Sequence, residues 1–371
     1  MDFTLGETQQ AVIRAAGPVL DRGQRPDRGQ LPDRGPLPGL GPPPAADGDD
    51  RALWKELGQA GLLELGTGGL GVLDTAVLLA EIGRRAAPVP ALATLAMGVL
   101  PVIRSGDPGL QRVLLDGVAA GETVLTAAVR EPSDPMPRAP ATTVTRAGTV
   151  SGVKIGVPYG AAARWILVPA SFSPGGAGVV VVVDPSADGV RLRRTPSSAG
   201  GPEYTLRLDE APVAHQLTGD RALAGLYQLT LAGAACLADG ALAGALALTT
   251  AHVGSREQFG RPLAAFQAVA QQIADVAIVS RTLHLAALSA CWRLETGREA
   301  GGELDVAAYW LAGLAPGALR TCHHLHGGTG MDVTYPLHRY SALIKDLVRL
   351  VGGADYRLDR IGARICAGAG G

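Results

Sequence analysis

The sequence predicts an α+β multidomain protein with the order helical domain, antiparallel β domain, helical domain. Three observations lead to this class. Apolar residues recur at helical spacing up to about residue 118, short runs rich in Val, Thr and Ile fill 119–217, and helical spacing returns over 218–371. The chain has 371 residues, of which 47% are hydrophobic and 18% are charged, so it can bury more than one core.

The N-terminal domain, 1–118, is expected to be all-helical. A short helix is predicted over 5–20, and an apolar stripe in 73–82 predicts another that ends before Pro88 and Pro90. A further helix is expected near 91–104. Between the first two helices, 21–44 is rich in Pro and Gly and repeats the unit DRG at a six-residue step. We interpret this insertion as a solvated loop, with a proline-rich ligand segment as the alternative.

The central domain, 119–217, is predicted to be an antiparallel β domain. Its apolar runs are short and are separated by turn residues, as in a chain of hairpins. The runs are TVLTAAV, TVSGVKIGVP, ARWILVPA, GVVVVVDP, GVRLRRT and YTLRL.

The C-terminal domain, 218–371, is predicted to be a helical bundle. A long Ala- and Gly-rich helix covers 221–252, and a second begins near Pro262. The second has an apolar seam at near-heptad spacing, formed by Phe266, Val269, Ile273, Val276 and Leu283. Further helices are expected near 303–325, 336–351 and 355–366. Residues 226–250 are long enough to span a membrane, but Asp239 lies in the middle, so a buried bundle helix is the better interpretation.

Composition excludes several classes of function. The formal net charge is -1, so the chain has no basic excess for nucleic acid. The four cysteines form no C-x-x-C pair, and the histidines at 323, 324, 326 and 338 lack the spacing of a metal site. The N-terminal residues do not have the pattern of a signal peptide. We therefore expect a cytoplasmic protein with no metal, no nucleic-acid partner and no membrane span.

Two segments of the C-terminal domain have the composition of a phosphate site. The first runs from Ser255 to Pro262 and includes Arg256, Gln258 and Phe259, with Gln267 a few residues later. The second is His324 to Gly330, which contains Gly327 and Gly328. An arginine can make a two-pronged contact to a diphosphate, and glycines let backbone N–H groups approach it. The alternative is a surface ion pair at Arg256 and an ordinary tight turn at the glycines.

These segments resemble two motifs of the acyl-CoA dehydrogenase family, R-x-Q-F-G…fQ and Q-x-x-G-G-x-G. Leu53-Trp54 with Gly61-Leu62, and Gly152-x-Lys154, are also similar to that family. The resemblance implies the acyl-CoA dehydrogenase fold: an N-terminal helical domain, a central antiparallel β domain and a C-terminal four-helix-bundle-like domain. It also implies an FAD cofactor and an acyl-CoA substrate.

In that family the two motifs bind the adenosine diphosphate part of the FAD held mainly by a neighbouring subunit. The resemblance therefore implies cofactor contacts from one set of residues: Arg256, Gln258, Phe259, Gln267, His324, Gly327 and Gly328. His324 stands where the family has Gln, and it retains the ability to donate a hydrogen bond.

The half of the site that holds the flavin ring departs from the family pattern. The family strand K-x-W-I-T/S-N is replaced here by 154–159, in which Gly156 takes the aromatic position. Pro158 takes the hydroxyl position and has no backbone N–H to donate. The loop at 130–134 is shorter than the family's T-E-P-x-x-G-S-D loop.

No catalytic residue is expected at the family's positions for the carboxylate that removes the α proton. Val351 and Thr230 occupy the two places where members carry this glutamate, and neither side chain is a base. A displaced carboxylate at Asp239, Asp346 or Asp355 is the alternative.

The sequence thus predicts an FAD-dependent acyl-CoA dehydrogenase that removes α and β hydrogens from an acyl-CoA. Because the half of the site that holds the flavin ring is altered, we expect this chain to be the non-catalytic, FAD-supporting subunit. Its partner would be a homologous acyl-CoA dehydrogenase subunit, in a heterotetramer, with a homo-oligomer as the alternative. A flavin monooxygenase on the same fold and a non-enzymatic scaffold are the two other hypotheses.

Overall fold

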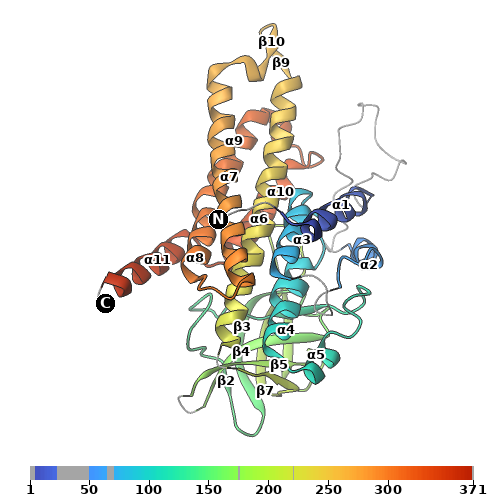
Figure 1. Ribbon diagram of the computed structural model, residues 1–371, viewed down its shortest axis with the longest axis vertical. Coiled ribbons are helices and arrows are strands. Elements are labelled where there is room, and N and C mark those ends of the chain that lie inside the picture. The colour runs from blue at the N-terminus through green and yellow to red at the C-terminus, as the bar shows by residue number, and fades with distance from the viewer. Residues whose placement is uncertain (1–4, 23–49, 65–70, 174–175, 220, 370–371) are drawn as a thin grey trace.

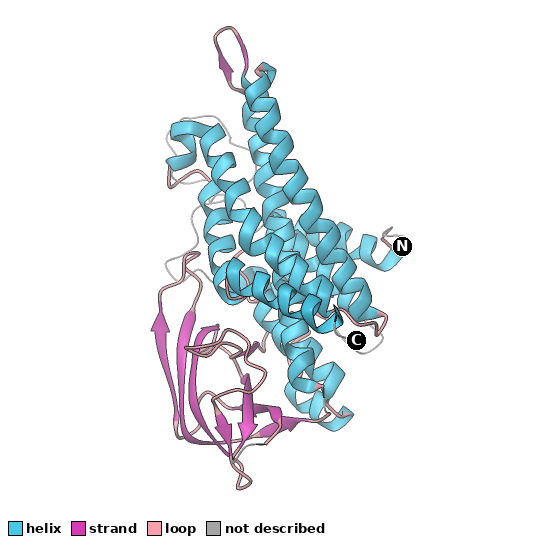
Figure 2. Cartoon of the chain, turned by 90° about the vertical axis from the view of Figure 1, so that its left-hand side faces the viewer, coloured by secondary structure: helices cyan, strands magenta, loops and turns pink. Residues whose placement is uncertain are grey.

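The computed structural model describes residues 5–22, 50–64, 71–173, 176–219 and 221–369. A β domain lies at one end of the molecule, and long helices extend from it to a small hairpin at the opposite end (Figures 1 and 2). The element order is helices, strands, helices, as the sequence predicts.

The N-terminal part forms helices at the expected places. They are α1 (Glu7–Arg22), α2 (Arg51–Gln59), α3 (Val72–Arg84), the π-helical segment Leu92–Val99, α4 (Leu100–Ser105) and α5 (Pro108–Leu114). Helix α1 includes Asp21 and Arg22, which the sequence assigned to the proline-rich insertion. Asp21 forms an ion pair with Arg85 of 2.6 Å between Oδ1 and Nε. The rest of the insertion, 23–44, lies outside the described residues.

The β domain contains a single large sheet in the order β6-β7-β3-β2-β4-β5-β8, with β1 paired to β4. The strands are β1 (Leu125–Ala127), β2 (Thr143–Val144), β3 (Thr149–Pro158), β4 (Trp165–Phe172), β5 (Gly178–Val183), β6 (Val190–Thr195), β7 (Glu203–Pro212) and β8 (His215–Leu217). Most neighbours are antiparallel, as predicted, but β1 and β2 both run parallel to β4. These two strands reach β4 through longer connections, which parallel pairing requires and which a hairpin count does not reveal.

The C-terminal part is built around α6 (Ala222–Ser255). The other helices are α7 (Gln267–Glu295), α8 (Gly301–Tyr309), the π-helical segment Trp310–Leu314, α9 (Ala315–His326), α10 (Leu337–Leu350) and α11 (Ala354–Ala369). Helix α7 starts five residues after the predicted Pro262. The intervening chain forms the strands β9 (Glu257–Gln258) and β10 (Arg261–Pro262), followed by one 3₁₀ turn, Leu263–Ala265.

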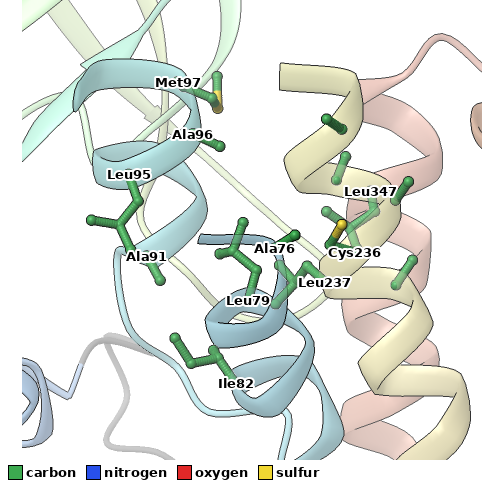
Figure 3. Close-up of a cluster of buried hydrophobic side chains, with 14 of the residues drawn as sticks. Ala76, Leu79, Ile82, Ala91, Leu95, Ala96, Met97, Cys236, Leu237 and Leu347 are labelled. Atoms are coloured by element: carbon green, nitrogen blue, oxygen red, sulfur yellow. The ribbon is translucent and has the colours of Figure 1, made fainter. Parts of the chain in front are cut away.

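Small residues let α3 and α6 pack closely. A Cβ at Gly240 would overlap the carbonyl oxygen of Ala80, and one at Gly83 would overlap that of Leu237. Figure 3 shows the apolar core that α3 and α6 share with the segment after α3 and with α10, including Ile82, Leu237 and Leu347.

Helices α6 and α7 are each long and apolar enough to cross a membrane, judged by length and composition alone. The most apolar stretch of α6 is 78% buried inside the protein, so α6 is the core helix of the bundle. The corresponding stretch of α7 is only 28% buried. Along the predicted seam, Val276 and Leu283 are buried, whereas Val269 and Ile273 are only half-buried. The seam is therefore covered by the protomer only in its C-terminal part.

Candidate functional site

The first motif segment forms a tight hairpin at the end of α6. Arg256 caps the helix, with its backbone N–H donating to the His252 carbonyl at 2.8 Å. Phe259 and Gly260 form the two-residue turn and have φ of +55° and +77°. Positive φ at both turn residues gives a hairpin whose twist matches the strands. The turn leaves the Phe259 side chain 91% exposed.

The second motif segment ends α9 in an open glycine turn. Gly327 has φ of +57°, and a Cβ added at Gly327 or Gly328 would meet no atom within 4 Å. His323 fixes this turn, because its Nδ1 lies 3.0 Å from the Gly330 carbonyl and its Nε2 lies 2.7 Å from the Ser341 hydroxyl. The backbone of the turn is thus held in place while its outer side stays free of side chains.

A pair of stacked histidines joins the two segments. The rings of His252 and His326 are 4.4 Å apart at an interplanar angle of 22°. The pKa of both imidazoles is lowered by burial, and Arg256 lowers that of His252 further. Two neutral rings can stack in this way, so the ends of α6 and α9 meet.

We call this end of the bundle, residues 252–267 with 323–330, the distal end. It holds every cofactor-binding residue that the sequence predicts: Arg256, Gln258, Phe259, Gln267, His324, Gly327 and Gly328. All seven are exposed. Over the described ranges, Arg256 forms no ion pair, so the surface pairing considered as its alternative is absent there. An exposed guanidinium and an open glycine turn at the same end of the bundle fit the diphosphate of FAD.

A cavity of about 700 Å³ lies away from the distal end, where the β domain meets the helices. Part of its lining is aliphatic and comes from α3, α6 and α10, including Ile82, Leu237 and Leu347. The same three side chains belong to the apolar core shown in Figure 3. Another part of the lining carries polar groups from β3 and from the loop between β6 and β7. Strand β3 contains most of the segment 154–159, which stands where the family has its flavin-ring strand, and this segment lines the cavity.

This chain's own residues do not fit a flavin ring at the cavity. Gly156 has φ of +63° and sits at an irregularity in the pairing of β3 with β7. The Nη1 atom of Arg130 lies 2.6 Å from the position that a Cβ at 156 would take. Arg130 therefore occupies the space above the strand where the family has an aromatic residue. Pro158 offers no N–H, and its carbonyl accepts from the Thr126 hydroxyl at 2.7 Å.

Charged groups close the polar side of the cavity. Arg349 donates to Glu203 at 3.2 and 2.8 Å and to Asp346 at 2.9 Å. Asp346 also accepts from the backbone N–H groups of Ser198 and Ala199, each at 2.8 Å. This cluster ties the β6–β7 loop to α10. No local pattern predicts this cluster, because the loop and the helix are far apart in the chain.

Lys154 and Glu131, which belong to the family-like segments of the β domain, form a buried pair of 2.7 Å outside the cavity. Burial lowers the pKa of Lys154 to about 8. Burial would raise the pKa of Glu131, but hydrogen bonds from Lys154 and Thr142 bring it below its usual value. The pair holds the loop after β1 against β3, so its role is structural.

The two positions of the family's catalytic glutamate are both in the core. The Thr230 hydroxyl donates to the Leu226 carbonyl at 2.8 Å, and Val351 is fully buried. Of the three alternative acids, Asp239 pairs with His284 at 2.8 Å and Asp355 is exposed on α11. Asp346 lines the cavity, but its carboxylate is engaged by Arg349 and the backbone N–H groups described above. The other acids that line the cavity are Glu203, which is bound by Arg349, and Asp50, which caps α2 by accepting from the Leu53 N–H. None of the three alternative acids is therefore placed as a free base in the cavity.

Comparisons with known proteins agree with this architecture. The model of the acyl-CoA dehydrogenase C-terminal domain matches residues 228–365. The acyl-CoA dehydrogenase FadE28 of Mycobacterium tuberculosis is 48% identical over 301 residues, covering 81% of this chain and 86% of FadE28. Among solved structures, a variant of the Tcur3481-Tcur3483 steroid ACAD has a TM-score of 0.89 at 32% identity and covers 99% of this chain and 100% of that chain. A chain of the ChsE4-ChsE5 complex of Mycobacterium tuberculosis has a TM-score of 0.86 at 29% identity, and the match covers 99% of this chain and 99% of that chain. The chain therefore belongs to the acyl-CoA dehydrogenase family, whose members are FAD-dependent oxidoreductases that act on CH–CH groups.

Proposed function

We propose that this chain is the non-catalytic, FAD-supporting subunit of a heteromeric acyl-CoA dehydrogenase. The observation that carries the proposal is the contrast between its two half-sites. The distal end presents Arg256 and open glycine backbone, whereas in the chain's own cavity Arg130 lies against Gly156, where the family has an aromatic residue, and Pro158 offers no N–H. A subunit of this kind completes its partner's site and forms none itself.

In the assembled enzyme, FAD held mainly by the partner would supply the acceptor for the β hydride, and a carboxylate of the partner would take the α proton. The role of this chain is to help bind and orient that FAD. Arg256 would neutralise diphosphate charge, and the open backbone at Gly328 would let phosphate oxygens approach. The Gly327 N–H already donates to the His324 carbonyl, so Gly327 shapes the turn. Gln258 and His324 supply further polar contacts, and Phe259 supplies an exposed ring for apolar or stacking contact.

The half-covered face of α7 supports assembly with another chain. Ile278 and Leu285 are 61% and 37% exposed, and the N-terminal part of the apolar seam is only half-buried. Exposed aliphatic side chains on a long helix are typical of an interface. Two solved relatives, Tcur3481-Tcur3483 and ChsE4-ChsE5, are pairs of different chains, which favours a homologous partner over a homo-oligomer.

The substrate that we propose is a bulky acyl-CoA, because one of these relatives is a steroid ACAD. We further propose a cytoplasmic location. Arg130 also argues against a flavin monooxygenase, since such an enzyme needs a flavin ring of its own.

The test is to purify the tagged full chain from its host and to measure flavin absorbance near 450 nm together with subunit composition. The proposal expects a second acyl-CoA dehydrogenase-like subunit and half as many flavins as chains. A homo-oligomer with one flavin per chain would contradict it. A partner complex without flavin would instead support the scaffold hypothesis.

A further inference from the structure

Arg130 is a half-buried cation that forms no ion pair among the described residues, although the Glu203 carboxylate lies nearby. Its carbonyl accepts from the Ile155 N–H at 3.0 Å, which fixes the residue opposite the irregular part of β3. Its Nε atom is buried and makes no hydrogen bond. In the described part of the chain, no carboxylate forms an ion pair with this guanidinium.

The acids nearest to Arg130 are already engaged. Glu203 binds the guanidinium of Arg349 through both carboxylate oxygens, and Asp346 binds Arg349 and two backbone N–H groups. The pKa of Arg130 is lowered by burial and then by the like charge of Arg349, while Glu203 opposes this only in part. Because a desolvated charge needs a counter-charge, the space beside Gly156 is a place for an anion.

The remainder of the cavity favours an apolar ligand body. Aliphatic side chains form much of the cavity lining, including Ile82, Leu237, Leu343 and Leu347. A volume of about 700 Å³ is within the range of small-molecule sites. The lining also carries three arginines, Arg85, Arg130 and Arg339, and three acids, Asp50, Glu203 and Asp346. Arg85 is paired with Asp21 and Glu81. The cavity thus combines a large apolar surface with a few charged groups, of which the Arg130 guanidinium forms no ion pair among the described residues.

We propose that this cavity is a non-redox binding site for an amphipathic carboxylate. The carboxylate contacts Arg130, and the apolar body lies against α3, α6 and α10. A neutral thioester carbonyl would leave the charge of Arg130 uncompensated. The proposal goes beyond the FAD-supporting role, because it concerns a cavity away from the distal end and needs no partner.

The first test compares two ligands of the same chain length on the wild-type full chain by titration calorimetry. We expect decanoate to bind about 10- to 150-fold more tightly than decan-1-ol, the ratio expected for one charge-assisted hydrogen bond. Equal affinity for the acid and the alcohol would overturn the proposal. This comparison needs no variant, so it stands even where a substitution impairs folding.

Two substitutions then place the ligand. Arg130→Gln should remove most of the preference for decanoate, whereas the matched control Arg146→Gln, on an exposed turn, should keep it. Ala342→Phe fills the cavity from α10 and should weaken both ligands. Decanoate affinity that is unchanged in Arg130→Gln, or in Ala342→Phe, would show that the carboxylate binds elsewhere and would refute the proposed site.

Discussion

Replacing Arg256 by alanine should weaken FAD retention in the assembled complex while leaving this chain folded. The side chain is exposed at the C-terminus of α6 and forms no ion pair within the described ranges, so no intramolecular contact is lost. What remains is its interaction with the helix dipole, typically about 0.3–1 kcal/mol. The change in unfolding free energy should therefore stay below about 1 kcal/mol.

The expected loss of FAD affinity is much larger. A charge-assisted contact to a phosphate contributes about 1.5–3 kcal/mol, which corresponds to roughly 10- to 150-fold in affinity. Arg256→Lys should recover only part of this, because an ammonium cannot make the two-pronged contact. Added salt should reduce the difference between wild type and variant, since the guanidinium is exposed.

The assay is a flavin titration of the complex, wild type against Arg256→Ala, with thermal unfolding measured in parallel. Arg14→Ala, which removes an exposed arginine from α1, is the control for loss of one positive charge. Unchanged FAD affinity in Arg256→Ala would refute the assignment of the distal end to a partner's cofactor. An equal loss in both variants would show that the effect is general electrostatics.

Three further substitutions are expected to change stability, which is measured by chemical denaturation. For Val351→Glu, dehydrogenase activity is assayed as well. Lys154→Met should cost about 3–5 kcal/mol, because it leaves a buried carboxylate without its partner. The pKa of Lys154 is lowered from its usual 10.5 to about 8 in the folded chain. Between these two pH values the unfolded chain binds more protons than the folded chain, so the free energy of unfolding of the wild type should rise with pH. This rise should vanish in Lys154→Met. Gly240→Ala should cost at least about 1–3 kcal/mol because its Cβ would overlap a backbone carbonyl of α3, whereas Gly254→Ala, in open space on the same helix, should be neutral or slightly stabilising. Val351→Glu should destabilise the chain and should not create dehydrogenase activity, because position 351 is fully buried and faces the core.

Element order was predictable because each segment has a strong local period. The Ala- and Gly-rich stretch of α6 has no amphipathic face, and it is indeed the most enclosed helix of the bundle. The start of α7 was placed five residues too early, because Phe259 and Gly260 allow a tight hairpin that local composition does not distinguish from a helix entry. The parallel partners of β4 were missed for a different reason, since strand pairing between distant segments leaves no local signal.

The cavity shows where sequence reasoning stops. Burial along β3 falls on Val150, Lys154 and Val157, so the alternation of faces changes between 154 and 157. The pairing with β7 is irregular at the same place, and Gly156 adopts the positive φ that this requires. A regular strand would have predicted a different direction for residue 156. Its proximity to Arg130 depends on this irregularity and was visible only in three dimensions.

Strand β3 shows why part of the family pattern can change without loss of the fold. The buried Lys154–Glu131 pair anchors the loop after β1, so the β domain needs it whether or not a flavin is bound. Position 156 has no such structural role, so the aromatic residue of the family pattern can be replaced there by glycine. The distal end presents the opposite case. Arg256 and Gly328 contribute little to the fold, since the arginine is unpaired within the described ranges and a Cβ at Gly328 would meet no atom within 4 Å. Gly327 differs, because its positive φ ends α9 and favours glycine for structural reasons. Because the fold does not demand Arg256 or Gly328, their presence points to a contact outside the chain, which favours a partner whose cofactor this subunit helps to hold.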